Sequence, residues 1–147
     1  GIFSLISLFK KIPYDKNLLI VGAEKNFKLN NLSKNISVKN IEQNEDKLIN
    51  YYDQSSIFIL PSFTEGHPMT LLEALSRNKP VIIFDEIEHV IGNKKGIYIS
   101  KRNSEDLNKT INFILENYQS IQEQIKENNL PTKDKFLEKM STVIDSN

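Results

Sequence analysis

The residues best suited to binding or catalysis lie in one segment, from Glu65 to Glu73. An apolar run just before it, Ile57 to Leu60, is typical of a buried strand, and Pro61 ends that strand. In an open α/β sheet, ligands bind beyond the carboxyl ends of the strands. The loop from Ser62 to His67 therefore lies where a ligand is expected.

The N-terminus of the helix expected from about residue 68 to residue 77 is a site where an anion can bind. Gly66 allows the backbone to approach a ligand closely. Pro68 stands at the first helical position, which tolerates proline because the amide there would be unpaired anyway. The amides of Met69 to Leu71 are then unpaired donors at the positive end of a helix, where a diphosphate is stabilised. Glu73, about one turn inside the helix, can accept hydrogen bonds from two neighbouring hydroxyls, as on a ribose.

The elements that must position this segment alternate between strands and helices. Three continuous apolar runs, Leu18 to Val21, Ile57 to Leu60 and Val81 to Phe84, predict strands buried on both faces. Weaker strands are expected at residues 36–38 and 96–100. Strands that alternate with helices predict an α/β fold with a parallel sheet.

Helical spacing of apolar residues predicts the remaining elements. The stripe Leu107, Ile111, Ile114 and Leu115 indicates a helix with Ser104 as its N-cap and acidic residues in its first turn. Other helices are expected at residues 2–9, 24–33, 45–53, 121–128 and from Thr132 onward, the last with an apolar face of Phe136, Leu137, Met140, Val143 and Ile144.

The composition narrows the class of function. The 147 residues suit one domain, and 19 basic residues balance 19 acidic ones, so no strong field favours nucleic acid or an anionic membrane. The absence of cysteine excludes disulfides, thiolate metal sites and a cysteine nucleophile, and two distant histidines do not make a zinc site. No apolar run approaches the roughly 20 residues that span a bilayer. Neither glycine-rich phosphate motif, GxGxxG or GxxxxGK, is present.

The segment PSFTEGHPMTLLEALSRNKPVIIFD, residues 61–85, resembles the signature of the family 4 glycosyltransferases, which have the GT-B fold. In that family, two glutamates separated by seven residues follow a strand that ends in Pro-Ser, and Glu65 and Glu73 have this spacing. The stretches NLLIVG, LINYYDQSSIFILPS and VIGNKKGIYIS are similar to the neighbouring elements of the family. The resemblance covers residues 1 to about 115.

The resemblance implies one Rossmann-like, three-layer domain over residues 1–147 with a helical C-terminal end. This domain would be the donor-binding, C-terminal half of a retaining transferase. It implies transfer of a hexosyl group from a nucleotide-diphosphate sugar to an acceptor hydroxyl, with neither a metal nor a cofactor. The implied setting is the cytoplasm, or the inner face of the membrane in the full-length protein, in the synthesis of cell-envelope polysaccharide.

Carried over residue by residue, the resemblance implies that Glu65 is catalytic and faces the anomeric centre of the donor sugar. Glu73 would bind the ribose hydroxyls, and the segment from Lys39 to Glu42 would lie beside the nucleobase. The diphosphate and the sugar hydroxyls would contact the chain from residue 66 to residue 71, that is Gly66, His67, Pro68, Met69, Thr70 and Leu71, with the imidazole of His67 able to touch the sugar.

Two departures from the family pattern bear on activity. The family has an Arg and a Lys upstream of the position that matches Gly1, after a first strand that is central in a sheet of order 3-2-1-4-5. The chain begins with Gly1 rather than Met, after these features, so we expect a fragment without the N-terminal acceptor domain that is inactive or nearly so alone. Ser56 also stands where the family often has Asp.

Other interpretations remain open. A non-catalytic nucleotide-sugar-binding or interaction module would keep the fold, with or without the ligand site, and an Arg and a Lys before Gly1 would favour the enzyme over it. A receiver-like signalling domain would need a phosphorylatable aspartate, for which Asp85 is the only candidate near a strand end, and no lysine pattern supports it. A dimer is expected if Phe136, Leu137 and Met140 of the last helix are left exposed.

Overall fold

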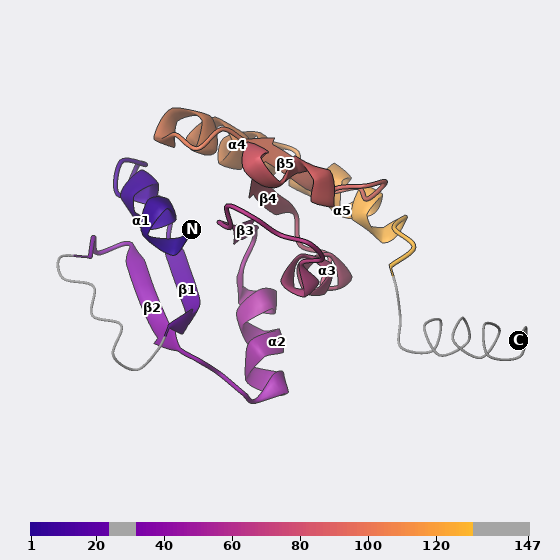
Figure 1. The fold of residues 1–147 in the computed structure, drawn as a ribbon, viewed down its shortest axis with the longest axis horizontal. Coiled ribbons are helices and arrows are strands. Elements are labelled where there is room, and N and C mark those ends of the chain that lie inside the picture. Colours follow the sequence, from indigo (N-terminus) through magenta and orange to yellow (C-terminus); the bar gives the residue numbers. More distant parts are fainter. Residues whose placement is uncertain (24–31, 131–147) are drawn as a thin grey trace, which may run out of the picture.

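The computed structural model describes residues 1–23 and 32–130, and every pair of neighbouring strands in this part of the chain is parallel. The predicted α/β class with parallel sheets is therefore confirmed. The strands form two sheets, one of β1 (Leu18–Ala23) and β2 (Ile36–Asn40), and one of β3 (Phe58–Leu60), β4 (Val81–Phe84) and β5 (Ile97–Ser100), in that order (Figure 1).

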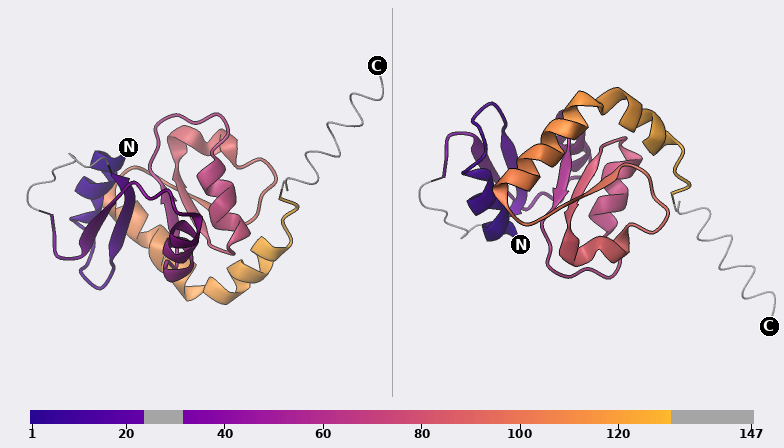
Figure 2. Two further views of the ribbon diagram at one scale, coloured as in Figure 1. Left: turned by 90° about the horizontal axis from the view of Figure 1, so that it is seen from below. Right: turned by 90° about the horizontal axis from the view of Figure 1, so that it is seen from above.

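Helices cover both faces of the larger sheet. In chain order, the helices of the described residues are α1 (Ile2–Phe9), α2 (Glu45–Gln54), α3 (Met69–Ser76), the 3-10 helix η1 (Asp85–Val90), α4 (Ser104–Glu116) and α5 (Tyr118–Lys126). α3 packs on β3 and β4, and α4 packs on β5. Figure 1 shows β3 to β5 between α3 on one side and α4 with α5 on the other. In Figure 2, α4 extends from α1 to α5 and so bridges the two sheets.

The core centres on β4, in which all four residues are 0% exposed. This strand alone meets the prediction of burial on both faces. α3 packs against it with buried residues on one side of the helix, at Leu71, Leu72, Ala74 and Leu75. Because successive helical residues are about 100° apart, burial of these four turns Glu73 outward toward solvent.

Two predictions for α4 are wrong in detail. Its N-cap is Asn103, whose Oδ1 accepts a hydrogen bond from the amide of Asp106 at 2.8 Å, and Ser104 is the first helical residue. Leu115 is 44% exposed, because the buried stripe runs through Leu107, Ile111 and Ile114. Leu115 comes one residue after Ile114, and the step of about 100° carries its side chain off the buried face.

β1 and β3 are less buried than predicted. Within β3 only Leu60 is buried, and Leu19 and Val21 of β1 are half-buried. β1 also continues past Gly22, where a strand end was predicted, to Ala23. The physical reason for the exposure is a cavity of about 800 Å³ that both strands border.

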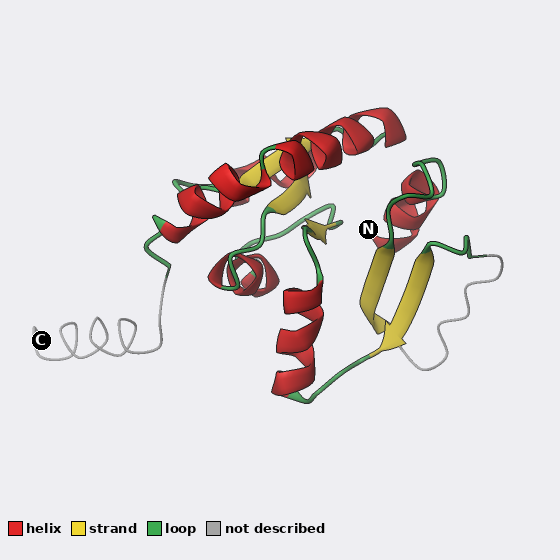
Figure 3. Cartoon of the chain, turned by 180° about the vertical axis from the view of Figure 1, so that it is seen from behind, coloured by secondary structure: helices red, strands yellow, loops and turns green. Residues whose placement is uncertain are grey.

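This cavity separates the two sheets, which stand apart in Figure 3. Residues of β1, β3, α1 and α2 line it, including Leu18, Ile20, Leu5, Phe9, Ile57, Ile59 and Tyr52. Within the described residues, β1 pairs only with β2 and β3 only with β4, so each strand has one unpaired edge. The gap falls where the resemblance places the central strand of the family's sheet.

Some predictions fall on residues that the structure does not describe. The helix expected at residues 24–33 lies mostly outside the described residues. The helix capped by Thr132, and with it the dimer contact through Phe136, Leu137 and Met140, lies wholly outside them. Among the helices of residues 1–23 and 32–130, none combines the length and the apolar character needed to cross a bilayer.

Candidate functional site

The loop between β3 and α3 lies where the strands of the larger sheet end, since Leu60, Phe84 and Ser100 are the last residues of three parallel strands. This is the edge where ligands are expected in such sheets. Pro68 is the N-cap of α3 and Met69 its first helical residue, so the predicted helix start is wrong by one position. No side chain caps the first turn, which leaves its amides available to an anion.

Glu65 is held by its neighbours at both its side chain and its backbone. The hydroxyl of Ser62 donates to Oε1 of Glu65 at 2.6 Å. The backbone oxygen of Glu65 lies 2.7 Å from Nε2 of His89, which comes from η1 and donates when the proton is on that nitrogen. Glu65 is half-buried, so one side of the carboxylate is oriented while the residue still reaches solvent.

Glu73 lies on the outward side of α3 and borders the large cavity together with Thr70. The hydroxyl of Tyr52, from α2, donates to Oε2 of Glu73 at 2.9 Å. Burial first, and then the bond to the carboxylate, raise the pKa of Tyr52, so it stays a donor at neutral pH. The ring of Tyr52 packs 5.7 Å from that of Phe58, which fixes the position of the hydroxyl.

The other predicted contacts differ in what they can offer a ligand. Gly66, His67 and Met69 are exposed. A Cβ atom at residue 66 would have no atom within 4 Å, so the space beside Gly66 is open to a ligand. Leu71 is 1% exposed and its side chain belongs to the core, so only its backbone can take part in binding.

A second hollow lies where the resemblance places the nucleobase. A cavity of about 410 Å³ is lined by Ala23 and by residues 40–43, just after β1 and β2 end. Ile41 and Glu42 line both this cavity and the larger one. The predicted segment from Lys39 to Glu42 therefore contributes Asn40, Ile41 and Glu42 to the wall, and the nucleobase contact itself stays a prediction.

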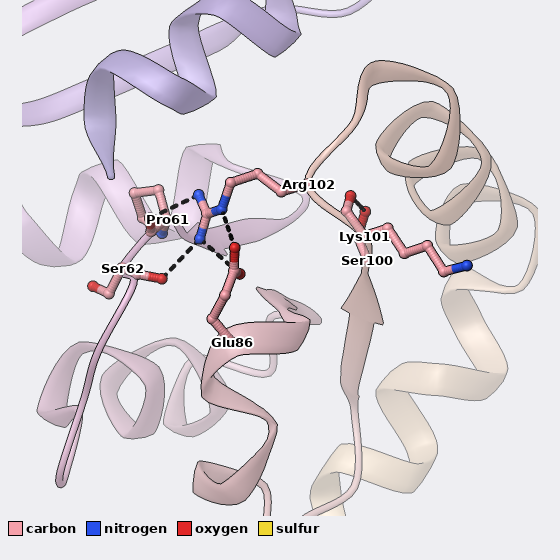
Figure 4. Close-up of polar contacts among 6 residues, drawn as sticks. All are labelled: Pro61, Ser62, Glu86, Ser100, Lys101 and Arg102. Atoms are coloured by element: carbon pink, nitrogen blue, oxygen red, sulfur yellow. Dashed lines mark hydrogen bonds and ion pairs between the residues drawn. The ribbon is translucent and has the colours of Figure 1, made fainter.

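Arg102, which no sequence motif predicted, follows β5 and joins the loop to η1 (Figure 4). Its guanidinium donates to the carbonyls of Pro61 and Ser62 at 3.2 Å and 2.9 Å. It also donates to both carboxylate oxygens of Glu86, at 2.7 Å and 3.0 Å. The only local signal was an arginine placed after a strand end, which does not reveal its partners 16 and 40 residues away.

The guanidinium of Arg102 holds the pKa of Glu86 below the ordinary range for glutamate, chiefly through the hydrogen bonds between them. A carboxylate with a lowered pKa stabilises the folded state above the ordinary glutamate pKa of about 4.3, and that stabilisation is lost as the pH falls through the lowered pKa. We expect Glu86→Gln to lower the unfolding free energy at pH 7, and the difference from wild type to shrink as the pH falls below the glutamate range. Urea unfolding as a function of pH checks this, and a difference independent of pH would contradict it.

The acidic side chains around the loop do not gather into a metal centre. Within residues 1–23 and 32–130, no group of three or more histidines, aspartates and glutamates is arranged to hold an ion. Glu65, Glu73 and Glu86 instead bind three different partners. The arrangement suits hydrogen bonding to hydroxyls and binding of a diphosphate at a helix end, and metal independence stays a prediction.

Comparison with known proteins identifies the family of this chain. Residues 1–130 match the family described as Glycosyl transferases group 1. The chain is 29% identical over 141 residues to an uncharacterized glycosyltransferase of Haemophilus influenzae, a match that covers 90% of this chain and 40% of that protein. It is also 29% identical over 72 residues, 47% of this chain and 19% of the relative, to the N,N'-diacetylbacillosaminyl-diphospho-undecaprenol alpha-1,3-N-acetylgalactosaminyltransferase of Campylobacter jejuni. The chain thus spans less than half the length of these curated relatives.

Proposed function

The chain belongs to the group 1 glycosyl transferases, and from that premise we propose that it is the donor-binding domain of a retaining, metal-independent hexosyltransferase. The observation that carries the proposal is the uncapped first turn of α3, which has Glu65 on the loop before it and Glu73 on its outward side. A nucleotide-diphosphate sugar has the complementary parts, which are two ribose hydroxyls, a diphosphate and a sugar. The domain would bind the donor, and the reaction would transfer the sugar to an acceptor hydroxyl.

Each part of the donor has a chemical counterpart in the domain. The amides of the first turn of α3 would stabilise the diphosphate, including the negative charge that grows when it leaves. Glu73 would accept hydrogen bonds from the ribose hydroxyls. Glu65 would lie beside the anomeric centre and stabilise the positive charge that develops there. The cavity next to residues 40–43 would take the nucleobase.

The relatives suggest which donors and acceptors to test. The name of the Campylobacter protein describes transfer of N-acetylgalactosamine to a sugar on diphospho-undecaprenol. We therefore propose a lipid-linked acceptor in cell-envelope polysaccharide synthesis, at the inner face of the membrane. The acceptor would bind a further domain of the longer protein.

Calorimetric titration of the chain with UDP, GDP and ADP sugars, N-acetylgalactosamine donors included, tests the proposal. We expect one nucleotide class to bind with a dissociation constant between about 1 μM and 1 mM, the range of ordinary enzyme–substrate affinities. The corresponding nucleoside diphosphate should compete for the same site. If no nucleotide sugar bound, the proposal would be wrong.

We also propose that, in a longer protein like its relatives, residues upstream of Gly1 supply a strand that fills the cavity between β1 and β3. A Cβ atom on Gly1 would overlap the carbonyl of Pro61, so the chain enters α1 beside the end of β3. A strand that ended there would run parallel to β3 and would lead through α1 to β1, the usual crossover in parallel sheets. It would pair the unpaired edges of both β1 and β3.

This strand is expected to raise stability strongly. Extending the chain upstream should increase the unfolding free energy by at least about 3 kcal/mol, because two or more apolar side chains would become buried in the cavity. Denaturant unfolding of the two chains measures the difference. As a control, the same extension with a proline at the middle of the strand should lose most of the gain, since proline cannot donate to a ladder. Equal stability of the original and the extended chain would contradict the prediction.

A further inference from the structure

Arg102 stands where the three strands of the larger sheet end; it belongs to the exit of one strand and contacts the exits of the other two. β3 leads to Pro61 and Ser62, β4 leads to Glu86 two residues after its end, and β5 leads to Arg102 itself. Figure 4 shows the guanidinium between the loop and η1, with its hydrogen bonds directed to both. The side chain of Arg102 is only 13% exposed, and its bonds to the carbonyls of Pro61 and Ser62 are partly buried, while the Glu86 side of the pair remains open to solvent.

The four hydrogen bonds use most of what a guanidinium can donate. Nε and Nη2 bind the two oxygens of Glu86, while Nη1 and Nη2 bind the carbonyls of Pro61 and Ser62. An arginine has five N–H groups, so one remains. To bind a diphosphate through several bonds, Arg102 would have to release Glu86 or the loop, and this distinguishes it from a direct ligand.

Two aromatic rings lie against the guanidinium. Its central carbon lies 3.9 Å from the ring centroid of Phe63 and 4.0 Å from that of Phe84. Phe63 belongs to the same loop, and its ring is otherwise 54% exposed. A planar guanidinium can lie against such rings while its edge donates several hydrogen bonds in a fixed fork, a combination that the point charge of a lysine ammonium does not reproduce.

The contacts of the loop continue from Arg102 to Glu65. Arg102 holds the carbonyl of Ser62, and the hydroxyl of Ser62 donates to the carboxylate of Glu65 at 2.6 Å. On the far side, His89 contacts the backbone oxygen of Glu65 at 2.7 Å. The loop is therefore held at its start by Arg102 and at residue 65 by η1, which Arg102 also contacts through Glu86.

We propose that Arg102 is a positioning residue that clamps the loop of residues 61–65 and so sets the place of Glu65 before the donor binds. The clamp is a property of the free protein. Its consequence for sugar transfer rests on the proposed function of Glu65. Arg102 acts through Pro61, Ser62 and Glu86 and does not touch the substrate.

Backbone dynamics test the clamp without any ligand. In ¹⁵N relaxation of the chain, the amides of residues 62–67 should have order parameters near about 0.85 in wild type and below about 0.6 in Arg102→Lys. The matched control is Arg77→Lys, because Arg77 also forms a two-bond pair with a carboxylate, that of Asp53, away from this loop. Arg77→Lys should leave residues 62–67 as ordered as in wild type. Unchanged order in Arg102→Lys, or equal loss in both variants, would overturn the proposal.

A second variant covers the case in which Arg102→Lys fails to fold. Glu86→Gln keeps the size of the side chain and weakens only one partner of the guanidinium. It should also lower the order parameters of residues 62–67, by a smaller amount than Arg102→Lys does. A Glu86→Gln loop that is as rigid as the wild-type loop would count against the clamp.

The consequence for catalysis is tested in the longer protein with the donor that wild type binds. Arg102→Lys should lower kcat about tenfold, because a displaced carboxylate stabilises the reacting centre less well, with the donor KM within about threefold of wild type. Arg77→Lys should change neither. If wild type transferred no sugar from any donor, the proposed function would fail while the relaxation data still decided the clamp. An unchanged kcat in Arg102→Lys, in an active enzyme, would refute the positioning role.

Discussion

Glu65→Gln is expected to lower kcat for sugar transfer about a thousandfold in the longer protein, with the affinity for the nucleoside diphosphate within about threefold of wild type. The substitution keeps the size of the side chain and an oxygen that can accept from Ser62, while it removes the charge and replaces one acceptor oxygen by an NH2 donor. Loss of one preorganised charge at the point where charge develops costs about 10²- to 10³-fold in other enzymes. Steady-state kinetics and calorimetry with the diphosphate separate the two quantities.

The control for this prediction is Glu88→Gln, which removes an exposed glutamate from η1 without touching the loop. Its kcat should match that of wild type. A Glu65→Gln protein that keeps transfer within tenfold of wild type would make Glu65 a solvated loop carboxylate. A wild-type protein that binds the donor and transfers nothing would favour the non-catalytic module.

Glu73→Ala is expected to weaken binding of the nucleoside diphosphate about a hundredfold. Two hydroxyls that hydrogen-bond to one carboxylate contribute about 1.5 kcal/mol or more each, and both bonds are lost together. The structure supports the direction of the effect, because Tyr52 holds Oε2 of Glu73 and the carboxylate borders the large cavity. Calorimetric titration measures the change in affinity.

A 2′-deoxy nucleotide makes this prediction sharper. Wild type should bind the deoxy form more weakly than the ribose form, and Glu73→Ala should bind both equally, since the partner of the hydroxyl is gone. Tyr52→Phe is the milder control, because it keeps the ring that packs on Phe58 and removes only the donor to Glu73. It should cost about threefold in affinity. If Glu73→Ala still bound the deoxy nucleotide as much more weakly than the ribose nucleotide as wild type does, Glu73 would not be the residue that binds the ribose hydroxyls.

The sequence was sufficient for features that depend on neighbouring residues. Runs of apolar residues predicted every described strand, and helical spacing predicted α1, α2, α3, α4 and α5 to within a few residues. The outward direction of Glu73 follows from the apolar residues on either side of it in α3. The family was also identifiable, because the loop and helix that carry its motif are one continuous segment, residues 61–85.

Predictions failed where a choice depended on the next element in space. Asn103 and Ser104 are both good N-caps, and the exit of β5 decides between them. Leu115 is as apolar as Ile114, but the face of α4 that meets β5 excludes it. Burial of β1 and β3 was overestimated because their apolar residues border a cavity.

Only the tertiary structure decided what supports the two glutamates of the motif. The bond from Tyr52 to Glu73 joins residues 21 apart, and the bond from Arg102 to Ser62 joins residues 40 apart. The first pair forms because α2 and α3 lie side by side, and the second because the parallel strands β3 and β5 end at one edge of a sheet, whatever the length of chain between them. Spacing along the chain determined that Glu65 and Glu73 belong to one loop and helix, and the order of the strands in space determined which residues hold them.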